Sequence, residues 1–570
     1  MLTHAALSSI GSEAGRGCPY NPGMTPYYIT TPIYYVNDRP HIGHCYTTLV
    51  CDVAARFQRR VLGQADDAPE ADKPVFFLTG TDEHAEKVVR SAAEHEMTPL
   101  AWADRNAAAF KAAFKTMNFS HDDFVRTTEE RHKSRATAYI KRLIESGDIE
   151  LGDYEGWYDA SQEEYVTETA AKENDYQSPV TGKPLERRTE QNYFFRLDKY
   201  TERLLKAYDL GKTSQPGGVR VLPESRLNEV LGRVKQGLQK VPVSRRIKPE
   251  DADWGIRMPG DDAHRIYVWI EALCNYLSTV DTPERRRFWP ATVHVMAKDI
   301  LWFHAVIWPA MLMALGEEPP RTVYAHAYWI REGRKMSKSL GNFIEIELLE
   351  AYADRYSLDA LRWYLMTQGP LGSTDSDFSH AHFVEVYNAD LANGIGNALS
   401  RVGNMIVKYF DGKVPDPKGV TTLHGRDWAR MIEDEVKESI YRAKQFDVAG
   451  AVRQGIELAK RVDGYIGDTR PFSLAKEIAG DDDPKRDELA AILYHCAEAL
   501  RVATILLEPA LPQKMAEAWR VWNWVPASGA TMLELADWGG AHSLRPGTAI
   551  AKGEALFMRA DLEEPAPAVS

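Results

Sequence analysis

Two short segments carry side chains that could together bind a nucleoside triphosphate and stabilise charge on its phosphates. Residues 40–44 read PHIGH, and residues 335–339 read KMSKS. Imidazole N–H groups and ammonium groups are good donors to phosphate oxygens. Two such words occur together in this order in on the order of one chain in a million of this length, so coincidence is a weak explanation. The pair predicts a site that activates a phosphate.

The first word is expected at the start of a helix that follows a β-strand. Residues 27–31 are β-prone, and Pro40 suits a first helical turn because its φ is fixed and its missing N–H is not needed there. His41 and His44 would then share one face near free backbone N–H groups, and Gly43 would let a nucleotide approach the backbone. Taken alone, two such histidines are more often capping or solvated residues. The second word favours the binding interpretation.

The second word predicts a mobile cationic loop, because Gly333 and Gly341 flank it. When a carboxylate attacks the α-phosphate of a triphosphate, charge grows on the departing pyrophosphate, and ammonium groups there stabilise the transition state. Lys335 and Lys338 are the candidates. An isolated lysine-rich loop is more often a solvated surface. No P-loop word is present, so a P-loop phosphotransferase is not supported.

Together the two words resemble the signatures of the class I aminoacyl-tRNA synthetases, and the surrounding residues resemble the methionine-specific members. The resemblance runs from about residue 26 to residue 512. It implies ATP, L-methionine and tRNA(Met) as substrates, Mg²⁺ on the phosphates, and a methionyl-adenylate intermediate. The terminal ribose 2′-hydroxyl of the tRNA would attack this adenylate.

Composition is that of an ordinary globular protein. The 570 residues are 44% apolar and 26% charged, and this length suggests about two to four domains. No apolar run reaches the ~18 residues that span a bilayer, and the richest run, at 305–315, is too short, so no membrane is expected as a partner. Five cysteines without a C-x-x-C spacing favour a reducing compartment, the cytoplasm by default.

Net charge is −13, yet RNA binding depends on local charge. Residues 226–248 are strongly basic, whereas residues 481–483 and 561–564 are acidic. A solvated helix face remains the commoner meaning of such a basic stretch, and RNA contact stays open.

The order of elements predicts an α/β protein with a Rossmann-like, doubly wound parallel sheet. Strand-like runs at 27–31, 75–79, 293–297 and 323–329 are each followed by a helical pattern. From about residue 380 the pattern is helical, as at 428–441 and 489–507, which predicts an all-α bundle. The expected parts are a disordered extension at 1–25, the catalytic domain at 26–117 and 231–379, an inserted connective subdomain at 118–230, an anticodon-binding helical domain at 380–560, and a frayed tail at 561–570.

Further residues take roles at the ends of these strands. Asp82 follows the strand at 75–79, where a carboxylate can hold an amino acid's ammonium group. Trp269, Ala272 and Tyr276 share one helical face, and so do Ile300 and His304, although such stripes are usually core packing. The resemblance implies a thioether pocket and a nucleotide-facing carboxylate. It assigns Ile33, Tyr35, Trp269, Ala272, Tyr276, Ile300 and His304 to the pocket, Asp82 to the ammonium group and Asp299 to the nucleotide.

Two departures from the family pattern stand out. Many relatives bind zinc in a knuckle within the insert, but Asp159, Gln162, Ser178 and Thr181 occupy the matching positions, so no structural zinc is expected. The resemblance also places anticodon contacts at Asn397 and Arg401. At the third position Phe472 replaces the family's tryptophan, and it still offers a ring for base stacking.

Two alternatives stay open. A class I enzyme for isoleucine, leucine or valine would need an editing domain, and the insert of about 110 residues is too small for one. An inactive relative that only binds RNA would not need both words. Some relatives carry a further C-terminal dimerising module that this sequence does not include, so a monomer is expected.

Overall fold

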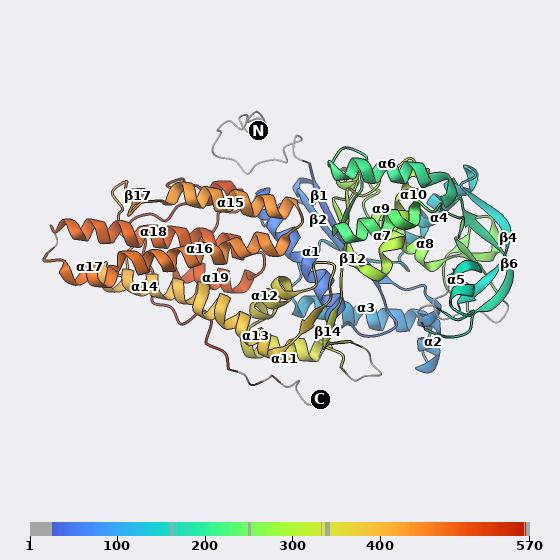
Figure 1. Ribbon diagram of the computed structural model, residues 1–570, viewed down its shortest axis with the longest axis horizontal. Helices are drawn as coiled ribbons and strands as arrows, with labels where there is room; N and C mark the ends of the chain where they lie inside the picture. Colours follow the sequence, from blue (N-terminus) through green and yellow to red (C-terminus); the bar gives the residue numbers. More distant parts are fainter. Residues whose placement is uncertain are drawn as a thin grey trace.

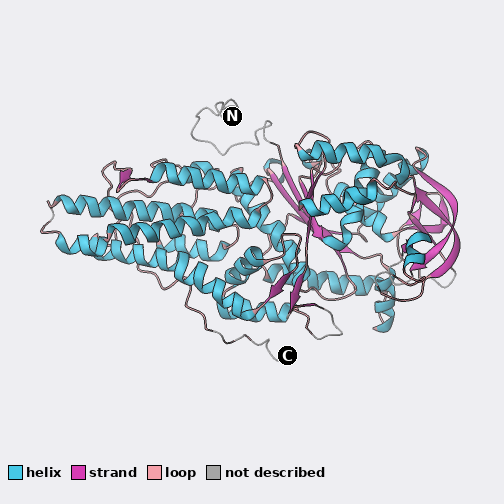
Figure 2. Ribbon diagram, viewed as in Figure 1, coloured by secondary structure: helices cyan, strands magenta, loops and turns pink. Residues whose placement is uncertain are grey.

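The computed structural model describes residues 25–159, 164–166, 168–178, 181–248, 252–331, 333–336, 342–480, 482–561, 563 and 565. Nearly all of the expected N-terminal extension therefore lies outside the described residues, as does Lys338 of the KMSKS word. The molecule is elongated, with a sheet-centred part at one end and a helical part at the other (Figure 1). Colouring by secondary structure shows the same division (Figure 2).

A six-stranded, fully parallel sheet forms the centre of the first part, as predicted. β2 is buried at every position, as expected for a strand covered on both faces. In spatial order the strands are β3 (Asp123–Arg126), β2 (Val75–Asp82), β1 (Tyr27–Tyr35), β12 (Val293–Ala297), β13 (Thr322–His326) and β7 (Arg220–Leu222).

Helices cover both faces of this sheet. On one face Ile29 and Phe77 pack in a core with Leu49 of α1 (Ile42–Val61). On the other face Met296 and Ala325 belong to a second core. The helices of that second core include α4 (Glu130–Glu145), α6 (Thr201–Lys212), α7 (Glu224–Val234) and α10 (Trp308–Ala314). The sheet is therefore doubly wound.

The expected insert at 118–230 contains two strands of the main sheet. β3 and β7 lie at the two edges of that sheet, so the boundaries of the separate subdomain are narrower than this range. Neither strand is predicted from the sequence, because each is only three or four residues long and at least one end of each carries a charged side chain. The subdomain's own antiparallel sheet consists of β5 (Glu164–Val166), β4 (Ile149–Asp159), β6 (Glu186–Phe195) and β8 (Val241–Pro242), with α5 (Glu168–Glu173) beside it.

Smaller elements complete the sheet-centred part. Two helices, α2 (Glu86–Glu94) and α3 (Pro99–Thr116), follow β2. A three-stranded sheet leads into α8 (Val268–Leu273) and α9 (Asn275–Ser278), and its strands are β9 (Ser244–Arg246), β10 (Arg257–Met258) and β11 (Asp261–Ile266). After β13 come β14 (Trp329–Arg331), β15 (Arg334–Lys335), α11 (Ile346–Tyr356), α12 (Leu358–Gln368) and β16 (Ser376–Phe378).

The described chain from residue 380 to Ala536 is mainly helical, as predicted, and includes one small β-hairpin. Its elements are α13 (His380–Val386), the π-helix η7 (Tyr387–Gly396), α14 (Asn397–Tyr409), β17 (Thr422–Leu423), β18 (Arg426–Asp427), α15 (Trp428–Lys444), α16 (Val448–Thr469), α17 (Pro471–Glu477), α18 (Pro484–Leu507), α19 (Pro512–Val521) and α20 (Met532–Ala536). Apolar residues of this bundle and of α1 form one continuous core. The two parts are therefore packed together and not merely linked.

α18 corrects one expectation from the sequence. It is long and apolar enough to cross a membrane by length and composition, with a mean hydropathy of 1.5 over its most apolar window. All of that window is buried inside the molecule, which is the environment of a core helix. α18 is therefore a longer apolar segment than the run at 305–315.

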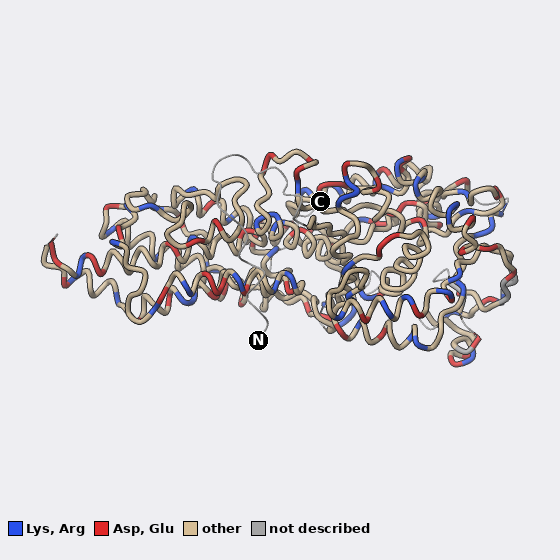
Figure 3. The backbone as a smooth tube through the Cα atoms, turned by 90° about the horizontal axis from the view of Figure 1, so that it is seen from above, with Lys and Arg blue, Asp and Glu red and all other residues tan. Residues whose placement is uncertain are grey.

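Charged residues of both signs are interspersed along both parts of the molecule (Figure 3). Within the basic stretch 226–248, Arg226 pairs with Glu229 and Lys240 with Glu150. The Arg233 guanidinium lies 3.8 Å from the Trp302 ring centre. Much of this stretch is therefore engaged locally, and its contact with RNA stays a prediction.

Candidate active site

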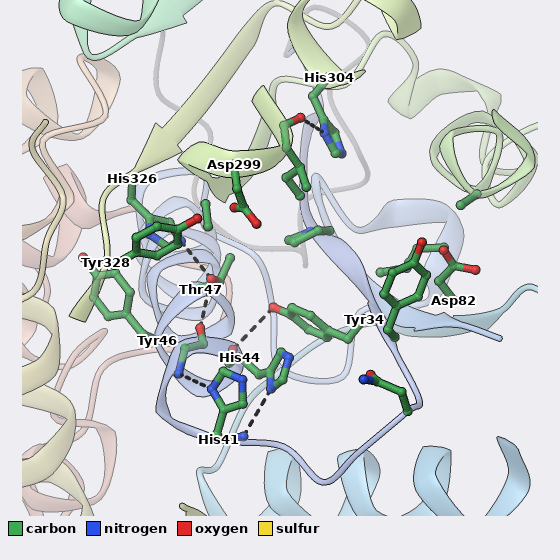
Figure 4. A pocket seen from close by; sticks show the side chains of 18 of the residues that line it. Tyr34, His41, His44, Tyr46, Thr47, Asp82, Asp299, His304, His326 and Tyr328 are labelled. Atoms are coloured by element: carbon green, nitrogen blue, oxygen red, sulfur yellow. Dashed lines mark hydrogen bonds between the residues drawn. The ribbon is translucent and has the colours of Figure 1, made fainter. Parts of the chain in front are cut away.

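A cavity of about 560 Å³ opens at the carboxyl ends of β1, β2, β12 and β13. This is where the doubly wound topology places a ligand site. The cavity brings together most of the residues predicted from the sequence (Figure 4). Those that line it are Ile33, Tyr35, His41, Gly43, His44, Asp82, Trp269, Ala272, Tyr276, Asp299, Ile300 and His304.

His41 and His44 form a capping box at the start of α1. The helix begins at Ile42, so His41 is its N-cap and not part of its first turn as expected. The Gly43 N–H donates to His41 Nδ1 at 3.0 Å, and the His41 N–H donates to His44 Nδ1 at 3.2 Å. The capping and ligand-binding interpretations are therefore compatible, because the same two rings cap the helix and line the cavity.

The hydrogen bonds also fix which ring nitrogen carries the proton. Burial lowers the pKa of His41 to about 4, and burial together with the nearby His41 lowers the pKa of His44 well below its usual value. Both rings are neutral at pH 7, and because each Nδ1 accepts a hydrogen bond, each proton lies on Nε2. The cavity thus gains two neutral N–H donors.

The packing around Gly43 favours glycine at this position for a reason that was not expected from the sequence. A β-carbon at this position would lie 2.9 Å from His41 Cε1. The N-cap ring occupies the space of a side chain, so the capping box requires glycine here.

The other end of the cavity is an aromatic pocket beside a carboxylate. The ring centre of Trp269 lies 4.4 Å from that of Phe303 in a stacked pair, and Tyr35 meets Trp269 edge-on at 5.7 Å. Asp82 ends β2 opposite Tyr35 in the β1–β2 register and is buried. The helix expected over these residues is interrupted between α8 and α9, yet Trp269, Ala272 and Tyr276 all line the cavity. An apolar, polarizable side chain would fit this wall.

Tyr276 and His304 close the pocket through a defined hydrogen bond. Tyr276 Oη lies 2.7 Å from His304 Nε2, and His304 Nδ1 lies 2.9 Å from the Ile300 carbonyl. The carbonyl can only accept, so His304 carries its proton on Nδ1 and accepts the tyrosine hydroxyl at Nε2. Burial lowers the pKa of His304 to about 4, so this arrangement persists at neutral pH.

Two lysines flank Tyr328, which lines the cavity. The ammonium groups of Lys298 and Lys335 lie 4.7 Å and 5.3 Å from its ring centre. Burial, and after it Asp299, raises the pKa of Tyr328. Lys335 is exposed on β15, outside the cavity lining, and Lys338 lies outside the described residues.

Thr47, His326 and Tyr328 are among the lining residues that are not predicted from the sequence. His326 ends β13, and its Nε2 lies 2.8 Å from Thr47 Oγ1. The rule that ligand-binding side chains follow parallel strands could have found His326, as it found Asp82.

The predicted anticodon residues lie in the helical part, on α14 and α17. α17 is at the end of the molecule away from the sheet (Figure 1). Asn397 is exposed and Phe472 is 40% exposed. The Arg401 guanidinium lies 5.5 Å from the Phe472 ring centre and 2.7 Å from Asp463 Oδ1. An exposed ring beside a guanidinium can stack on an unpaired base.

The knuckle positions are held by hydrogen bonds and packing. The Thr181 N–H donates to Ser178 Oγ at 3.1 Å, and the Ser178 N–H donates to the Lys183 carbonyl at 2.7 Å. Val166, Ala171 and Leu185 form a small core beside them. In the part of the chain that the structure describes, no three His, Cys, Asp or Glu side chains are grouped for a metal. Gln162 lies outside that part.

The chain is similar to known proteins over most of its length. The family described as tRNA synthetases class I (M) matches residues 27–174 and 170–403. The chain is 39% identical over 565 residues to the methionine–tRNA ligase of Streptomyces coelicolor, covering 95% of this chain and 98% of that protein. It is 39% identical over 564 residues to the methionine–tRNA ligase of Bacillus subtilis, covering 94% and 78%. The Mycobacterium tuberculosis methionyl-tRNA synthetase in complex with methionyl-adenylate has a TM-score of 0.79 and 32% identity, covering 94% of this chain and 100% of that chain.

Proposed function

The chain belongs to the methionine-specific class I tRNA synthetases, and from this membership we propose how its cleft performs their reaction. The enzyme attaches L-methionine to tRNA(Met) at the expense of ATP, through a methionyl-adenylate. The observation that carries the assignment of roles is that one cavity joins the two histidines at the start of α1 to Asp82 and the aromatic pocket.

Methionine is proposed to bind with its ammonium group at Asp82 and its thioether against Trp269 and Tyr276. The buried carboxylate supplies a charge partner that any amino acid would use. The aromatic wall selects the side chain, because sulfur gains from contact with rings. This arrangement leaves the methionine carboxylate pointing toward the His41 end of the cavity.

In the first step that carboxylate attacks the α-phosphate of ATP, and the bond to pyrophosphate breaks. The Nε2–H groups of His41 and His44 are proposed to donate to phosphate oxygens, with Lys335 and Lys338 stabilising the pyrophosphate as it leaves. These interactions grow stronger as charge develops, which is the requirement for catalysis. Asp299 is proposed to face the nucleotide.

Mg²⁺ is proposed to enter with the nucleotide. Three carboxylates, Asp38, Asp82 and Asp299, line the cavity, but they are not grouped as a set of ligands for a metal, which is compatible with an ion held mostly by phosphates and water. Such an ion neutralises charge on the phosphates. The residue roles proposed for the second step do not depend on where this ion lies.

In the second step the terminal ribose 2′-hydroxyl of the tRNA attacks the adenylate carbonyl, and AMP leaves. Asn397, Arg401 and Phe472 are proposed to contact the anticodon at the other end of the molecule. The exposure of Phe472 beside the Arg401 guanidinium supports this role. Phe472→Ala should lower aminoacylation of tRNA(Met) and leave adenylate formation unchanged.

A monomer without structural zinc, located in the cytoplasm, completes the proposal. The cysteines among the described residues are free and buried, which agrees with a reducing compartment. Sedimentation of the purified protein tests the oligomeric state.

Pyrophosphate exchange with each of the amino acids tests the function. We expect exchange of labelled pyrophosphate into ATP with methionine, and much weaker exchange with leucine, isoleucine or valine. Preference for one of these would indicate another class I enzyme. Absence of exchange with every amino acid, together with binding of tRNA, would indicate an RNA-binding relative.

A further inference from the structure

A buried carboxylate lies directly behind the proposed methionine pocket. Glu271 of α8 is fully buried, between Trp269 and Ala272 in the chain. Its Oε1 lies 2.7 Å from His84 Nδ1, and its Oε2 lies 2.7 Å from His132 Nε2. Neither the adenylation step nor the transfer step uses this group.

These two hydrogen bonds form a bridge with one arm to His84 and one arm to His132. The His84 arm reaches the turn that directly follows Asp82, the last residue of β2. His84 follows Asp82 by two residues, and Glu83 between them is also held on several sides. Arg126 donates to both oxygens of the Glu83 carboxylate at 2.7 Å and 3.0 Å. The Trp254 indole donates to the Glu83 carbonyl at 2.8 Å. The backbone at Asp82 is therefore fastened from the side away from the cavity.

The second arm reaches α4 and α9. His132 of α4 is fully buried, and its Nδ1 lies 3.2 Å from Ser278 Oγ of α9. The Glu271 carboxylate therefore connects the turn after β2, α8, α4 and α9. Of these elements, the turn directly follows Asp82, the proposed ammonium-binding group, and α8 carries Trp269, the proposed wall for the side chain.

We propose that Glu271 is a positioning residue that sets the separation between Asp82 and the Trp269 wall, and thereby the affinity and selectivity for methionine. This inference rests on the proposed function of the pocket. Asp82 must meet the ammonium group while Trp269 meets the thioether of the same molecule, so a shift between their supporting elements weakens both contacts at once. ATP binds at the other end of the cavity and should be much less affected.

The bridge needs its hydrogen bonds more than its charge. In a Glu271→Gln variant the amide oxygen can accept from one histidine, and the amide N–H can donate to the other if that neutral ring moves its proton to its second nitrogen. His132 can do this, because a proton on Nδ1 can be donated to Ser278 Oγ. Glu271→Ala removes both contacts and leaves two buried imidazoles without their acceptor.

The test is a set of variants compared by pyrophosphate exchange and by calorimetric binding of methionine without ATP. For Glu271→Ala we expect the KM and Kd for methionine to rise about 30-fold, with the KM for ATP within about threefold of wild type and a smaller methionine-to-leucine ratio. Glu271→Gln should recover most of this loss. His84→Ala, which removes only the hydrogen bond between Glu271 and the turn after Asp82, should raise the methionine constants about tenfold and serves if Glu271→Ala does not fold.

Glu498→Gln is the matched control. Glu498 is also a fully buried glutamate, paired with Arg501 in the helical part at 2.6 Å. This variant should lower the melting temperature without changing the methionine constants. The proposal fails if Glu271→Ala and His84→Ala lower only the melting temperature, or if they raise the constants for ATP and methionine together. Failure of the proposed function would be seen separately, as wild-type protein without methionine-dependent exchange.

Discussion

At the scale of single residues, the cleft combines neutral donors with one buried carboxylate. His41, His44 and His304 are held neutral by burial, so their donor and acceptor positions do not change near neutral pH. Asp82 supplies negative charge beside the aromatic pocket, and the Lys335 ammonium group lies 5.3 Å from the ring centre of Tyr328, which lines the same cavity. This separation of charge matches a ligand with an ammonium group at one end and phosphates at the other.

In the proposed methionine pocket, mutation of the Asp82 carboxylate and mutation of the aromatic wall should have different effects on amino acid binding. Asp82→Asn keeps the size of the side chain but removes the charge partner, which should cost about 2 to 5 kcal/mol of binding for any amino acid. Trp269→Ala removes apolar wall, so it should weaken methionine and reduce its advantage over leucine. Exchange with methionine and leucine measures both effects. If Asp82→Asn changed the methionine-to-leucine ratio and Trp269→Ala left it intact, the assignment of the pocket would be wrong.

Lys338 should act on the rate and not on the affinity for methionine. Charge appears on pyrophosphate only as the bond to the α-phosphate breaks, so Lys338→Ala should lower the adenylation rate about 10²-fold or more with little change in the methionine Kd. Rapid-quench measurement of adenylate formation gives the rate. Lys141→Ala, at an exposed position on α4, should have no effect. A larger loss of methionine binding than of rate would contradict the proposed role.

At the scale of elements, hydrogen bonds and ring contacts connect the described parts of the insert's knuckle. Trp157 is held by a 2.8 Å hydrogen bond from its indole N–H to Glu168, and its ring lies 4.5 Å from that of Tyr176. These contacts join β4, α5 and the following turn around the small apolar core. That this segment holds no structural zinc stays a prediction.

The purified protein should contain no stoichiometric zinc. Its melting temperature should be the same with and without chelator, because no binding energy of a metal would be lost. Elemental analysis and a thermal scan in EDTA check this. One zinc per chain would refute the prediction.

At the scale of the whole molecule, a buried joint connects the sheet-centred and helical parts. Arg362 of α12 is fully buried, and its guanidinium lies 2.7 Å from Asp52 Oδ2 of α1. The same guanidinium donates to the carbonyls of Pro509 and Ala510, both at 3.2 Å, at the corner between α18 and α19. The helix that begins with the two histidines is thereby tied to the bundle that carries the proposed anticodon residues.

Arg362→Ala should strongly destabilise the protein. It leaves Asp52 buried with part of its neutralising charge removed, and breaking a buried pair in this way costs about 3 to 5 kcal/mol. The midpoint of urea unfolding measures the change. Arg355→Ala, which removes an exposed pair with Asp561 and Glu563, is the control and should change the midpoint little. Equal shifts for both variants would show that the joint does not stabilise the molecule.

Asp359, one turn before Arg362, should lower the free energy of unfolding as the pH rises from about 4 through about 6. Its Oδ2 accepts from the Lys514 N–H of α19 at 2.6 Å, and burial raises its pKa to about 6. A carboxyl whose pKa is higher in the folded state stabilises the fold below the unfolded value, near 4, and loses this contribution as pH rises through about 6.

Asp359→Asn should therefore gain stability relative to the wild type between pH 4 and pH 7, by about 3 kcal/mol at most. The amide keeps an oxygen for the Lys514 N–H and cannot ionise. Urea unfolding of both proteins at pH 4, 5, 6 and 7 measures the difference. A difference that stays constant over this range would show that Asp359 does not titrate there.

The sequence by itself determined the parts of the fold and the site that depend on short segments. The strand at 75–79 is predicted because an unbroken apolar run cannot be exposed on either face, and Asp82 follows from its place after that strand. The pocket residues were expected from the resemblance to a known family, because their spacing alone favours core packing, and they line one cavity together with His41, Gly43 and His44.

Only the tertiary structure decided the features that depend on contacts between distant segments. β3 and β7 are too short to be recognised until a neighbouring strand supplies their hydrogen bonds. Glu271 is an unremarkable helical residue until His84 and His132 meet its carboxylate from other elements. Arg362 and Asp52 are 310 residues apart, and no local pattern predicts that two charges will be buried together. A periodic pattern reports which face is apolar, but the partner of a buried polar group is chosen by the folded chain as a whole.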